Sequence, residues 1–419
     1  MGKLIITNVT VDGKDCLFRG LHNEKRFYDI GIELWQNNNI KNNYVNQNND
    51  KVGNIYVGFV RDIVKNIGAA FVEYQKGKIG YFSITDEEPV FLNHKTNEKL
   101  CQGDLILVQL KKEAVKTKAP VLTSRISISG KYIVLNVSKS GVGCSNKIVD
   151  HDFKKRIKEG IEEILEKVFL DTGEKYGVVI RTNAVEADFD GIERELLGLI
   201  NDYRKMKESA KCQTRFSVIK SEQPAYLKMI IGAYENEIDE IITDQAFVYQ
   251  EIMNYVNSIK FEKYKDVVRL YDDPMLPLAK LYSVENTLKE LRTKKVWLKS
   301  GAYLVIEQTE AMVVIDVNTG KCIKGKDMKK TVLNVNLEAA KEIACQLRLR
   351  NLSGIIMIDF ISMNDAEDKN KVTDCVKRLI RDDKVRTDFV EMTKLDLVEL
   401  TRKKIEPPVN EQLDRILEI

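Results

Sequence analysis

The sequence predicts a multi-domain protein of the α+β and α/β classes, and three observations lead to this prediction. The chain has 419 residues, more than one ordinary hydrophobic core accommodates, so two or three domains are expected. Short apolar stretches punctuated by glycine fill residues 53 to 137, as in a small all-β domain. From Leu276 onward, strand-length and helix-length apolar patterns alternate, which is typical of an α/β unit.

The charge balance excludes a generally basic or acidic protein. Lys and Arg number 66 against 63 Asp and Glu, so any nucleic-acid binding has to come from local patches. Seven cysteines are an odd number, and none forms a C-x-x-C pair, so neither a disulfide framework nor a zinc knuckle is indicated. The chain shows no signal peptide and no apolar run of membrane-spanning length. A cytoplasmic protein without a membrane span is therefore expected.

The N-terminal segment predicts part of a β-sheet. Apolar and polar residues alternate over Leu4–Val9 and Phe27–Leu34, the pattern of half-exposed strands, which we expect to form a hairpin of a larger sheet. The segment from Gln36 to Asp50 is rich in Asn and has little to bury. A mobile loop is expected there.

The next stretch predicts a five-stranded barrel of the OB type. Its short strands carry aromatic residues at positions that alternate with the apolar core. Barrels of this type bind single strands by stacking bases on aromatic rings beside a basic groove. Phe71 and Tyr81 are candidate stacking residues, and Lys118 is a candidate phosphate contact. An aromatic residue in a small barrel is more often part of its core, but the basic residues nearby favour a binding surface.

Two amphipathic helices are expected in the middle of the chain, over 152–169 and 189–211, with a strand over Tyr176–Ile180 between them. Arg181 and Thr182 follow that strand. A guanidinium beside a hydroxyl can form a small anion site through charge-assisted hydrogen bonds. From spacing alone, a surface ion pair of Arg181 is the better interpretation.

The last third of the chain predicts an α/β unit. Its expected elements are, in order, a helix over 279–293, strands over Tyr303–Gln308 and Met312–Val317, a helix with Asn336 as its N-cap, a strand over Gly354–Asp359, a helix through Val372 and Leu379, a helix stopped by Pro407 and Pro408, and a short amphipathic tail.

Two of these strands end in a carboxylate, Asp316 and Asp359. If the strands are neighbours in a sheet, the two anions lie close together at one edge. Between them the chain carries eight Lys or Arg against three acids, a setting that suits Mg²⁺ and a polyanionic substrate. Asn318 lies two residues further on the same side of its strand, where its amide can orient Asp316. An Asp at a strand end is more often a turn or cap residue, and the pattern alone leaves that alternative open.

Three long motifs resemble the signature of the ribonuclease E/G family in order and spacing. They are Ala311–Gly320 (AMVVIDVNTG), Asn336–Arg350 (NLEAAKEIACQLRLR) and Gly354–Met363 (GIIMIDFISM). The resemblance extends back to about residue 27 and forward to about residue 405. It implies a Mg²⁺-dependent endoribonuclease that cleaves single-stranded, AU-rich RNA, prefers 5′-monophosphorylated ends, and acts in mRNA decay and in rRNA and tRNA processing.

The resemblance also implies roles for individual residues. Asp316 and Asp359 match the metal ligands, and Asn318 matches the amide that supports them. The family's 5′-phosphate sensor is matched by Arg181 and Thr182, which favours an anion site over the surface ion pair. The RNA-contacting positions of the family's S1-type barrel are matched by Phe71, Tyr81 and Lys118, with Tyr81 in place of the more usual Phe.

The fold that the resemblance implies has five parts. These are an RNase H-like subdomain formed by 1–52 and 213–278, an S1-type OB-fold barrel at 53–137 inserted into it, a 5′-sensor region at 138–212, a DNase I-like catalytic subdomain at 279–405, and a C-terminal tail at 406–419.

The sequence departs from the family pattern at two places. The C-P-x-C motif that usually follows the catalytic subdomain is replaced by Glu406-Pro407-Pro408; a homo-oligomer stays open, but a zinc-linked dimer is not expected. Asn183-Ala184 stands where the family tends to have Ala-Gly, so an altered phosphate pocket and weaker 5′-end sensing are expected. The competing hypotheses are a non-catalytic RNA-binding or scaffold protein with a vestigial acidic site, and a nuclease that hydrolyses DNA.

Overall fold

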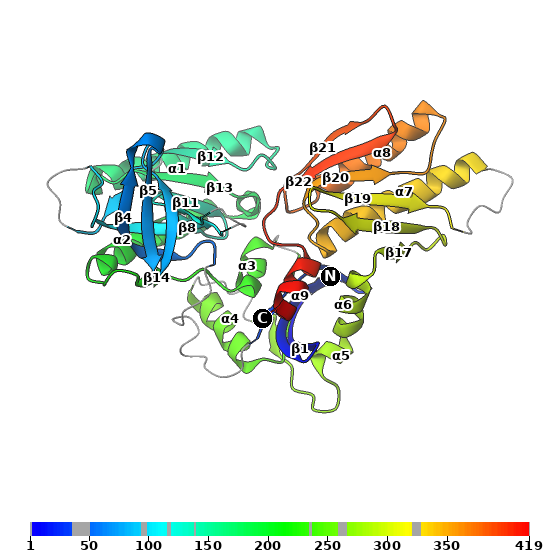
Figure 1. Cartoon of the computed structure of the whole chain (residues 1–419), viewed down its shortest axis with the longest axis horizontal. Coiled ribbons are helices and arrows are strands. Elements are labelled where there is room, and N and C mark those ends of the chain that lie inside the picture. The colour runs from blue at the N-terminus through cyan, green and yellow to red at the C-terminus, as the bar shows by residue number, and fades with distance from the viewer. Residues whose placement is uncertain are drawn as a thin grey trace. The chain divides into compact units, whose positions relative to one another are not determined.

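The structure, a computed structural model, describes residues 2–35, 51–93, 99–114, 119–137, 140–233, 237–258, 266–320 and 328–418 (Figure 1). The Asn-rich segment and Lys118, for which the sequence predicts a mobile loop and a phosphate contact, lie outside these residues. By its internal contacts the chain divides into two units, Met1–Asn37 with Glu237–Ile419, and Asn38–Asn236. No helix among the described residues is long and apolar enough to cross a membrane.

The first unit contains a five-stranded sheet in the order β16-β15-β1-β2-β3. The first three strands in the chain are β1 (Lys3–Val11), β2 (Lys14–His22) and β3 (Phe27–Leu34). A two-residue turn, Asp12-Gly13 with positive φ at both residues, joins β1 to β2, which is the turn that an Asp-Gly pair favours in a hairpin. The predicted hairpin between 4–9 and 27–34 is therefore wrong, because β2 lies between these strands and pairs with both.

Two strands and three helices from later in the chain complete this sheet and its core. The strands β15 (Glu240–Thr243) and β16 (Val268–Leu270) run parallel to β1. The helices α5 (Leu278–Leu281), α6 (Val284–Arg292) and α9 (Val409–Glu418) pack on it. The expected single helix over 279–293 is broken at Ser283, which has positive φ. The tail predicted to be amphipathic forms the helix α9 and buries Leu413 and Ile416. The two prolines precede α9 and stop no helix.

The first unit also contains a six-stranded sheet in the order β17-β18-β19-β20-β22-β21. Its strands are β17 (Lys295–Trp297), β18 (Tyr303–Gln308), β19 (Met312–Asn318), β20 (Gly354–Asp359), β21 (Thr387–Met392) and β22 (Leu397–Arg402). Only β19 and β20 pair in parallel. The helices α7 (Met328–Leu349) and α8 (Ala366–Arg381) pack on one face (Figure 1). The strands predicted at 303–308, 312–317 and 354–359 are confirmed.

The predicted N-cap role of Asn336 is wrong. Asn336 lies inside α7 and is fully buried. Its side-chain amide donates a hydrogen bond to the carbonyl oxygen of Ile361 (2.8 Å) and accepts one from the Ile361 N–H (3.1 Å). A buried amide has to satisfy its hydrogen-bonding groups, and here it does so by fixing the chain just after β20 to α7.

The second unit contains a closed barrel of five strands, as predicted. The ring runs through β4 (Ile55–Val64), β5 (Ala69–Gln75), β6 (Lys78–Ser83), β9 (Val121–Thr123) and β8 (Leu105–Lys112), and it closes because β8 pairs with β4. Two short strands extend the ring, β7 (Val90–Phe91) beside β8 and β14 (Val218–Lys220) beside β4. The barrel is consistent with an S1/OB-like subdomain.

The second unit also contains a four-stranded sheet in the order β10-β11-β13-β12, on which two helices pack. Its elements are β10 (Ser127–Ser129), β11 (Ile133–Val137), β12 (Gly141–Cys144), β13 (Tyr176–Ile180), α1 (His151–Thr172) and α2 (Phe189–Lys211). Both helices contribute their apolar faces to the core. The predicted helices and the strand between them are confirmed.

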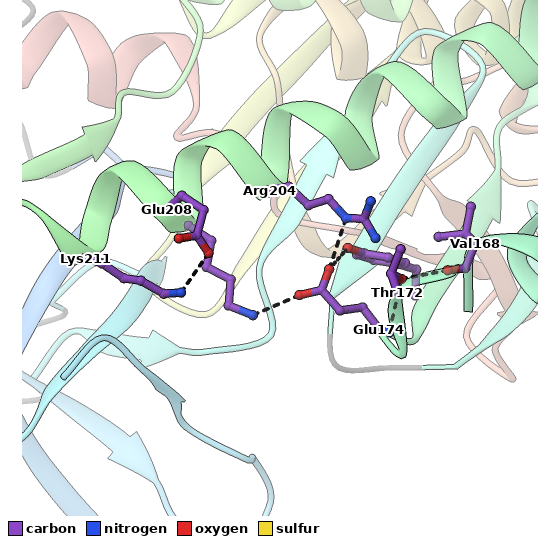
Figure 2. A network of polar contacts seen from close by, with 8 residues as sticks. Val168, Thr172, Glu174, Arg204, Glu208 and Lys211 are labelled. Atoms are coloured by element: carbon purple, nitrogen blue, oxygen red, sulfur yellow. Dashed lines mark hydrogen bonds and ion pairs between the residues drawn. The ribbon is translucent and has the colours of Figure 1, made fainter. Parts of the chain in front are cut away.

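A polar network fixes the start of β13 against α2 (Figure 2). The Glu174 carboxylate accepts hydrogen bonds from the Tyr176 hydroxyl (2.5 Å), Arg204 Nε (3.2 Å) and Lys207 Nζ (2.9 Å). Burial and the hydrogen bond to Glu174 raise the pKa of Tyr176 to about 12. The network holds one end of the strand whose other end leads to Arg181.

The chain also forms the helices α3 (Ala225–Gly232) and α4 (Ala246–Ser258). By the division of contacts α3 belongs to the second unit and α4 to the first. The RNase H-like and DNase I-like assignments and the boundaries of the expected subdomains stay predictions.

Candidate functional site

The six-stranded sheet places the two predicted carboxylates side by side. In the parallel pairing of β19 with β20, Asp316 and Asp359 are direct register partners. On β19, Val313, Ile315 and Val317 are buried in the core shared with α7 and α8. Because side chains alternate between the two faces of a strand, Asp316 lies on the opposite, open face, and both carboxylates are exposed.

The Asn318 amide holds one carboxylate in place. Its Nδ2 donates a hydrogen bond to Asp316 Oδ2 at 2.6 Å. Asn318 is two residues beyond Asp316, so both side chains lie on the open face. The predicted orienting contact between these two residues is therefore present in the structure, although their functional role is still a prediction.

The electrostatics of the pair favour a bound cation. Burial and, after it, the neighbouring Asp316 charge raise the pKa of the Asp359 carboxyl, because both disfavour the charged form of the carboxyl. No group of three or more His, Cys, Asp or Glu residues is positioned to hold a metal within the described ranges. Two carboxylates and an amide form a donor set suited to a hard ion that keeps several waters, and a poor one for structural zinc.

Gly320 packs closely against Gly301 at this end of the sheet. Gly320 has positive φ, and a β-carbon at this position would clash with the carbonyl oxygen of Gly301 in the turn between β17 and β18. Only glycine permits this close approach without strain. The chain leaving β19 is thereby held against the β17–β18 turn, next to Asn318.

The barrel places the two predicted aromatic residues on its outer surface. Phe71 and Tyr81 are direct cross-strand partners on β5 and β6, and both are half-exposed. Their sequence neighbours Ala70, Val72 and Phe82 form the barrel core instead. The alternative that these aromatic residues are barrel core is therefore wrong, and their contact with RNA remains a prediction.

Sequence reasoning missed a third aromatic residue on the same surface. Phe59 on β4 pairs with Glu73, two residues from Phe71 on β5. The guanidinium groups of Arg61 and Arg215 lie 5.4 and 5.5 Å from the centre of its ring. Arg61 also forms an ion pair with Glu73. The sequence alone could have indicated Phe59, because it lies two residues from the charged Arg61 and therefore on the same face of the strand.

Arg181 lies where β13 ends, against the turn from Gly130 to Ile133. Its backbone N–H donates to the Tyr132 carbonyl (2.8 Å), and its Nη1 donates to the Gly130 carbonyl (2.5 Å). Thr182 begins a short 3₁₀ helix, Thr182–Glu186. The structure thus brings a guanidinium and a hydroxyl to one end of the sheet, as the anion-site hypothesis requires.

A carboxylate that sequence reasoning missed holds this turn from the other side. Glu195 on α2 accepts hydrogen bonds from the N–H groups of Lys131, Tyr132 and Ile133 at 2.6, 2.9 and 3.0 Å. Burial raises the pKa of the Glu195 carboxyl, and the three N–H groups and Arg181 oppose that rise. No local pattern marks Glu195, because its partners lie more than 60 positions away in the sequence.

The Asn183-Ala184 departure from the family pattern causes no backbone strain. Neither residue has positive φ. The buried Asn183 amide donates to the carbonyl oxygens of Ile231 (3.3 Å) and Ala233 (3.0 Å), at the end of α3, and Ala184 is part of the core. Glycine is therefore not required here, and Asn183 adds a tether to α3.

Comparison with known proteins decides the family. A sequence profile of the ribonuclease E/G family matches residues 127–405, more than half of the chain. The chain belongs to the ribonuclease E/G family. The matched range includes Arg181, Thr182, Asp316, Asn318 and Asp359.

Individual relatives agree with this assignment. Ribonuclease G of Salmonella typhimurium (strain SL1344) is 31% identical over 380 residues, which cover 86% of this chain and 74% of the relative. Ribonuclease G of Haemophilus influenzae is 32% identical over 377 residues, 87% of this chain and 74% of the relative. Ribonuclease E of Synechocystis sp. is 30% identical over 392 residues, 90% of this chain and 56% of the relative. The predictions of family membership and of an endoribonuclease are therefore confirmed.

Proposed function

We propose that this endoribonuclease depends on Mg²⁺, cleaves single-stranded, AU-rich RNA with a preference for 5′-monophosphorylated ends, and acts in mRNA decay and in rRNA and tRNA processing. One observation carries the proposal. Asp316 and Asp359 are register partners on the open face of a sheet, and Asn318 orients Asp316. Two neighbouring carboxylates repel each other and so raise the free energy of the folded protein when no cation is bound. Such unfavourable charge pairs are common at functional sites, which is a reason to assign this pair a catalytic role.

The residues present fit Mg²⁺. The carboxylates of Asp316 and Asp359 would hold the ion, which when bound acidifies water and neutralises charge on phosphate oxygens. Asn318 fixes the Asp316 carboxylate so that its free oxygen keeps a constant direction. The open face gives an extended RNA strand access to the pair.

The RNA strand would be held by residues of the barrel. Phe71 and Tyr81 present their half-exposed rings side by side, and every base has a face that stacks on such a ring, so binding there tolerates many sequences. Lys118, predicted as a phosphate contact, would supply a positive charge. These contacts bind the strand and leave hydrolysis to the carboxylate pair.

The 5′ end would be recognised at Arg181 and Thr182. The guanidinium and hydroxyl are hydrogen-bond donors, and a 5′-monophosphate is a strong acceptor with about two negative charges. The Gly130–Ile133 turn and Asn183 fix this end of the sheet. A 5′-hydroxyl end lacks the acceptor oxygens, so it gains less from these donors.

The experiment is a cleavage assay on labelled single-stranded RNA, with Mg²⁺ or with EDTA. Cleavage should require Mg²⁺, and Asp359→Asn should abolish it while RNA binding in a gel shift stays nearly intact. Glu399→Gln is a matched control, because Glu399 lies on the same sheet as the partner of Met357 and should not affect cleavage. Retained cleavage by Asp359→Asn would refute the assignment.

The same assay separates the competing hypotheses. A gel shift without Mg²⁺-dependent cleavage would favour a scaffold with a vestigial acidic site. Equal cleavage of single-stranded DNA and RNA of the same sequence would show a nuclease that does not select RNA. Preferential cleavage of the RNA is the expected outcome.

A further inference from the structure

The open face of the six-stranded sheet carries aromatic side chains in line with the carboxylate site. Trp297 on β17 pairs with Tyr303 on β18, and Tyr303 pairs with Asn318 on β19. The neighbouring row consists of Lys295, Val305, Asp316 and Asp359 on four successive strands. Val296, Leu304 and Val317, which alternate with these residues, pack in the core on the other face.

This register fixes how far the aromatic residues lie from the carboxylates. Neighbouring strands are about 4.8 Å apart, so Tyr303 is one strand, and Trp297 about two strands or roughly 10 Å, from the strand that carries Asp316 and Asn318. A base joined to a phosphate at the carboxylate pair can reach that distance through its sugar. The aromatic residues would therefore lie beside a phosphate bound at the carboxylate pair.

Lys295 contacts the rings of both Trp297 and Tyr303. Its ammonium lies 4.0 Å from the centre of the Trp297 ring and 3.6 Å from that of Tyr303. The rings meet edge to face, with centres 5.3 Å apart at an interplanar angle of 61°. Among the described residues no carboxylate pairs with Lys295, so its charge is available to a polyanion. An ammonium next to the rings also strengthens attraction to a strand that carries phosphates.

Trp297 is more exposed than its chemistry favours. The residue is 64% exposed, although Trp buries more apolar area than almost any other residue. Although Lys295 and Tyr303 contact the ring, this exposure leaves much of Trp297 accessible to solvent. An exposed aromatic face beside a positive charge is the arrangement on which single-stranded nucleic acids stack.

We propose that Trp297 and Tyr303, braced by Lys295, form a stacking platform for a nucleobase of the single-stranded RNA next to the scissile phosphate. This inference rests on the proposed function of Asp316 and Asp359. The platform positions the strand at the cleavage site, separately from the aromatic surface of the barrel. Trp297 supplies the exposed ring, Tyr303 lies on the strand between Trp297 and Asn318, and Lys295 contacts both rings.

The first test uses fluorescence, because the chain has only two tryptophans, Trp35 and Trp297. In a Trp35→Phe variant all tryptophan emission comes from Trp297. Titration with single-stranded RNA in EDTA should quench this emission, because a stacked base quenches indole fluorescence. A duplex RNA of the same sequence should quench it far less. Absence of quenching at RNA concentrations that saturate a gel shift would overturn the platform.

The second test measures cleavage kinetics on a short RNA with one abasic position moved along the strand. For the wild type, KM should rise about 10-fold when the abasic position meets the platform. Trp297→Ala should raise KM by a similar factor on intact RNA and should remove the effect of that abasic position. Trp297→Phe keeps a stacking surface and should stay close to the wild type. Thermal melting should show that both variants fold, since the side chain is exposed.

The outcomes distinguish this inference from the proposed function. Mg²⁺-dependent cleavage with the same KM in Trp297→Ala would overturn the platform alone. Quenching of Trp297 by RNA without any cleavage by the wild type would overturn the proposed function and leave the platform as a binding site. A change in Trp297 emission with protein concentration, without RNA, would assign this face to a second copy of the chain and would also overturn the platform.

Discussion

The carboxylate pair and the Arg181 corner are built in opposite ways. Asp316, Asn318 and Asp359 stand on an open sheet face, and their geometry follows from strand parity and one pairing register. Arg181 is fixed by backbone carbonyls of a turn, and that turn is held in place by Glu195. The first region places two carboxylates side by side, and no fold contact among the described residues of the sheet requires them there. In the second region, the charged groups of Arg181 and Glu195 form hydrogen bonds that stabilise the turn. Substitutions of the carboxylate pair should therefore reduce activity, whereas loss of Glu195 should reduce stability.

The largest expected effect is on catalysis at the open face. Asp316→Asn should lower the cleavage rate by at least about 10³-fold, since it removes a ligand of an ion worth several kcal/mol in the transition state. The free energy of unfolding should change by less than about 0.5 kcal/mol, because the side chain is exposed. Single-turnover cleavage and urea unfolding of the same preparation measure both quantities. A large loss of stability would show that the pair is structural.

The reverse result is expected at the Arg181 corner. Glu195→Ala leaves the N–H groups of Lys131, Tyr132 and Ile133 without their acceptor, which should lower the free energy of unfolding by about 3 kcal/mol. Glu193→Ala, on the same helix, is the matched control and should have little effect. Urea unfolding compares the two variants. Equal stabilities would contradict the role assigned to Glu195.

A smaller and more selective effect is expected for Arg181. Arg181→Ala should slow cleavage of 5′-monophosphorylated RNA about 10-fold more than cleavage of the same RNA with a 5′-hydroxyl, in line with the loss of a charge-assisted hydrogen bond. Competition between the two substrates in one reaction gives the ratio directly. Equal slowing of both would refute a sensor role and leave Arg181 as a brace for the Gly130–Ile133 turn.

The smallest effect is a dependence of stability on pH. The raised pKa of Asp359 means that the folded, metal-free protein binds this proton more tightly than the unfolded chain. Its contribution to stability is therefore present below the unfolded pKa and is lost as pH rises through the folded pKa. In EDTA near pH 7, Asp359→Asn should raise the melting temperature slightly, and the gain should shrink as the pH falls toward the ordinary range of an Asp. A gain that does not change with pH would contradict the burial and repulsion of the charged Asp359 carboxylate as its cause.

Strand parity made the sheet that carries Asp316 and Asp359 predictable. Buried and more exposed residues alternate along β19 and over Ile355–Asp359 of β20, and the family motifs fix both Asp positions. The aromatic pair Phe71 and Tyr81 was found because it has the parity opposite to the barrel core. In both cases the signal is local, so a single stretch of sequence contains it.

The missed features depend on contacts between distant parts of the chain. Asn336 has the composition of an N-cap but bonds to Ile361, 25 residues away, and this partner cannot be read from the helix pattern. Glu195 is one of many acids on an amphipathic helix until its three N–H donors are known. The platform at Trp297 needs the register of β17, β18 and β19. The positions of these residues depend on contacts between distant parts of the chain more than on local propensity.

The central claim is that Asp316 and Asp359 together hold the catalytic ion, and metal binding tests it most directly. Isothermal titration of the RNA-free protein with Mn²⁺, as a Mg²⁺ substitute, should show binding that is lost in Asp316→Asn and in Asp359→Asn and kept in Glu399→Gln. Binding that persists unchanged in both Asp variants would contradict the claim.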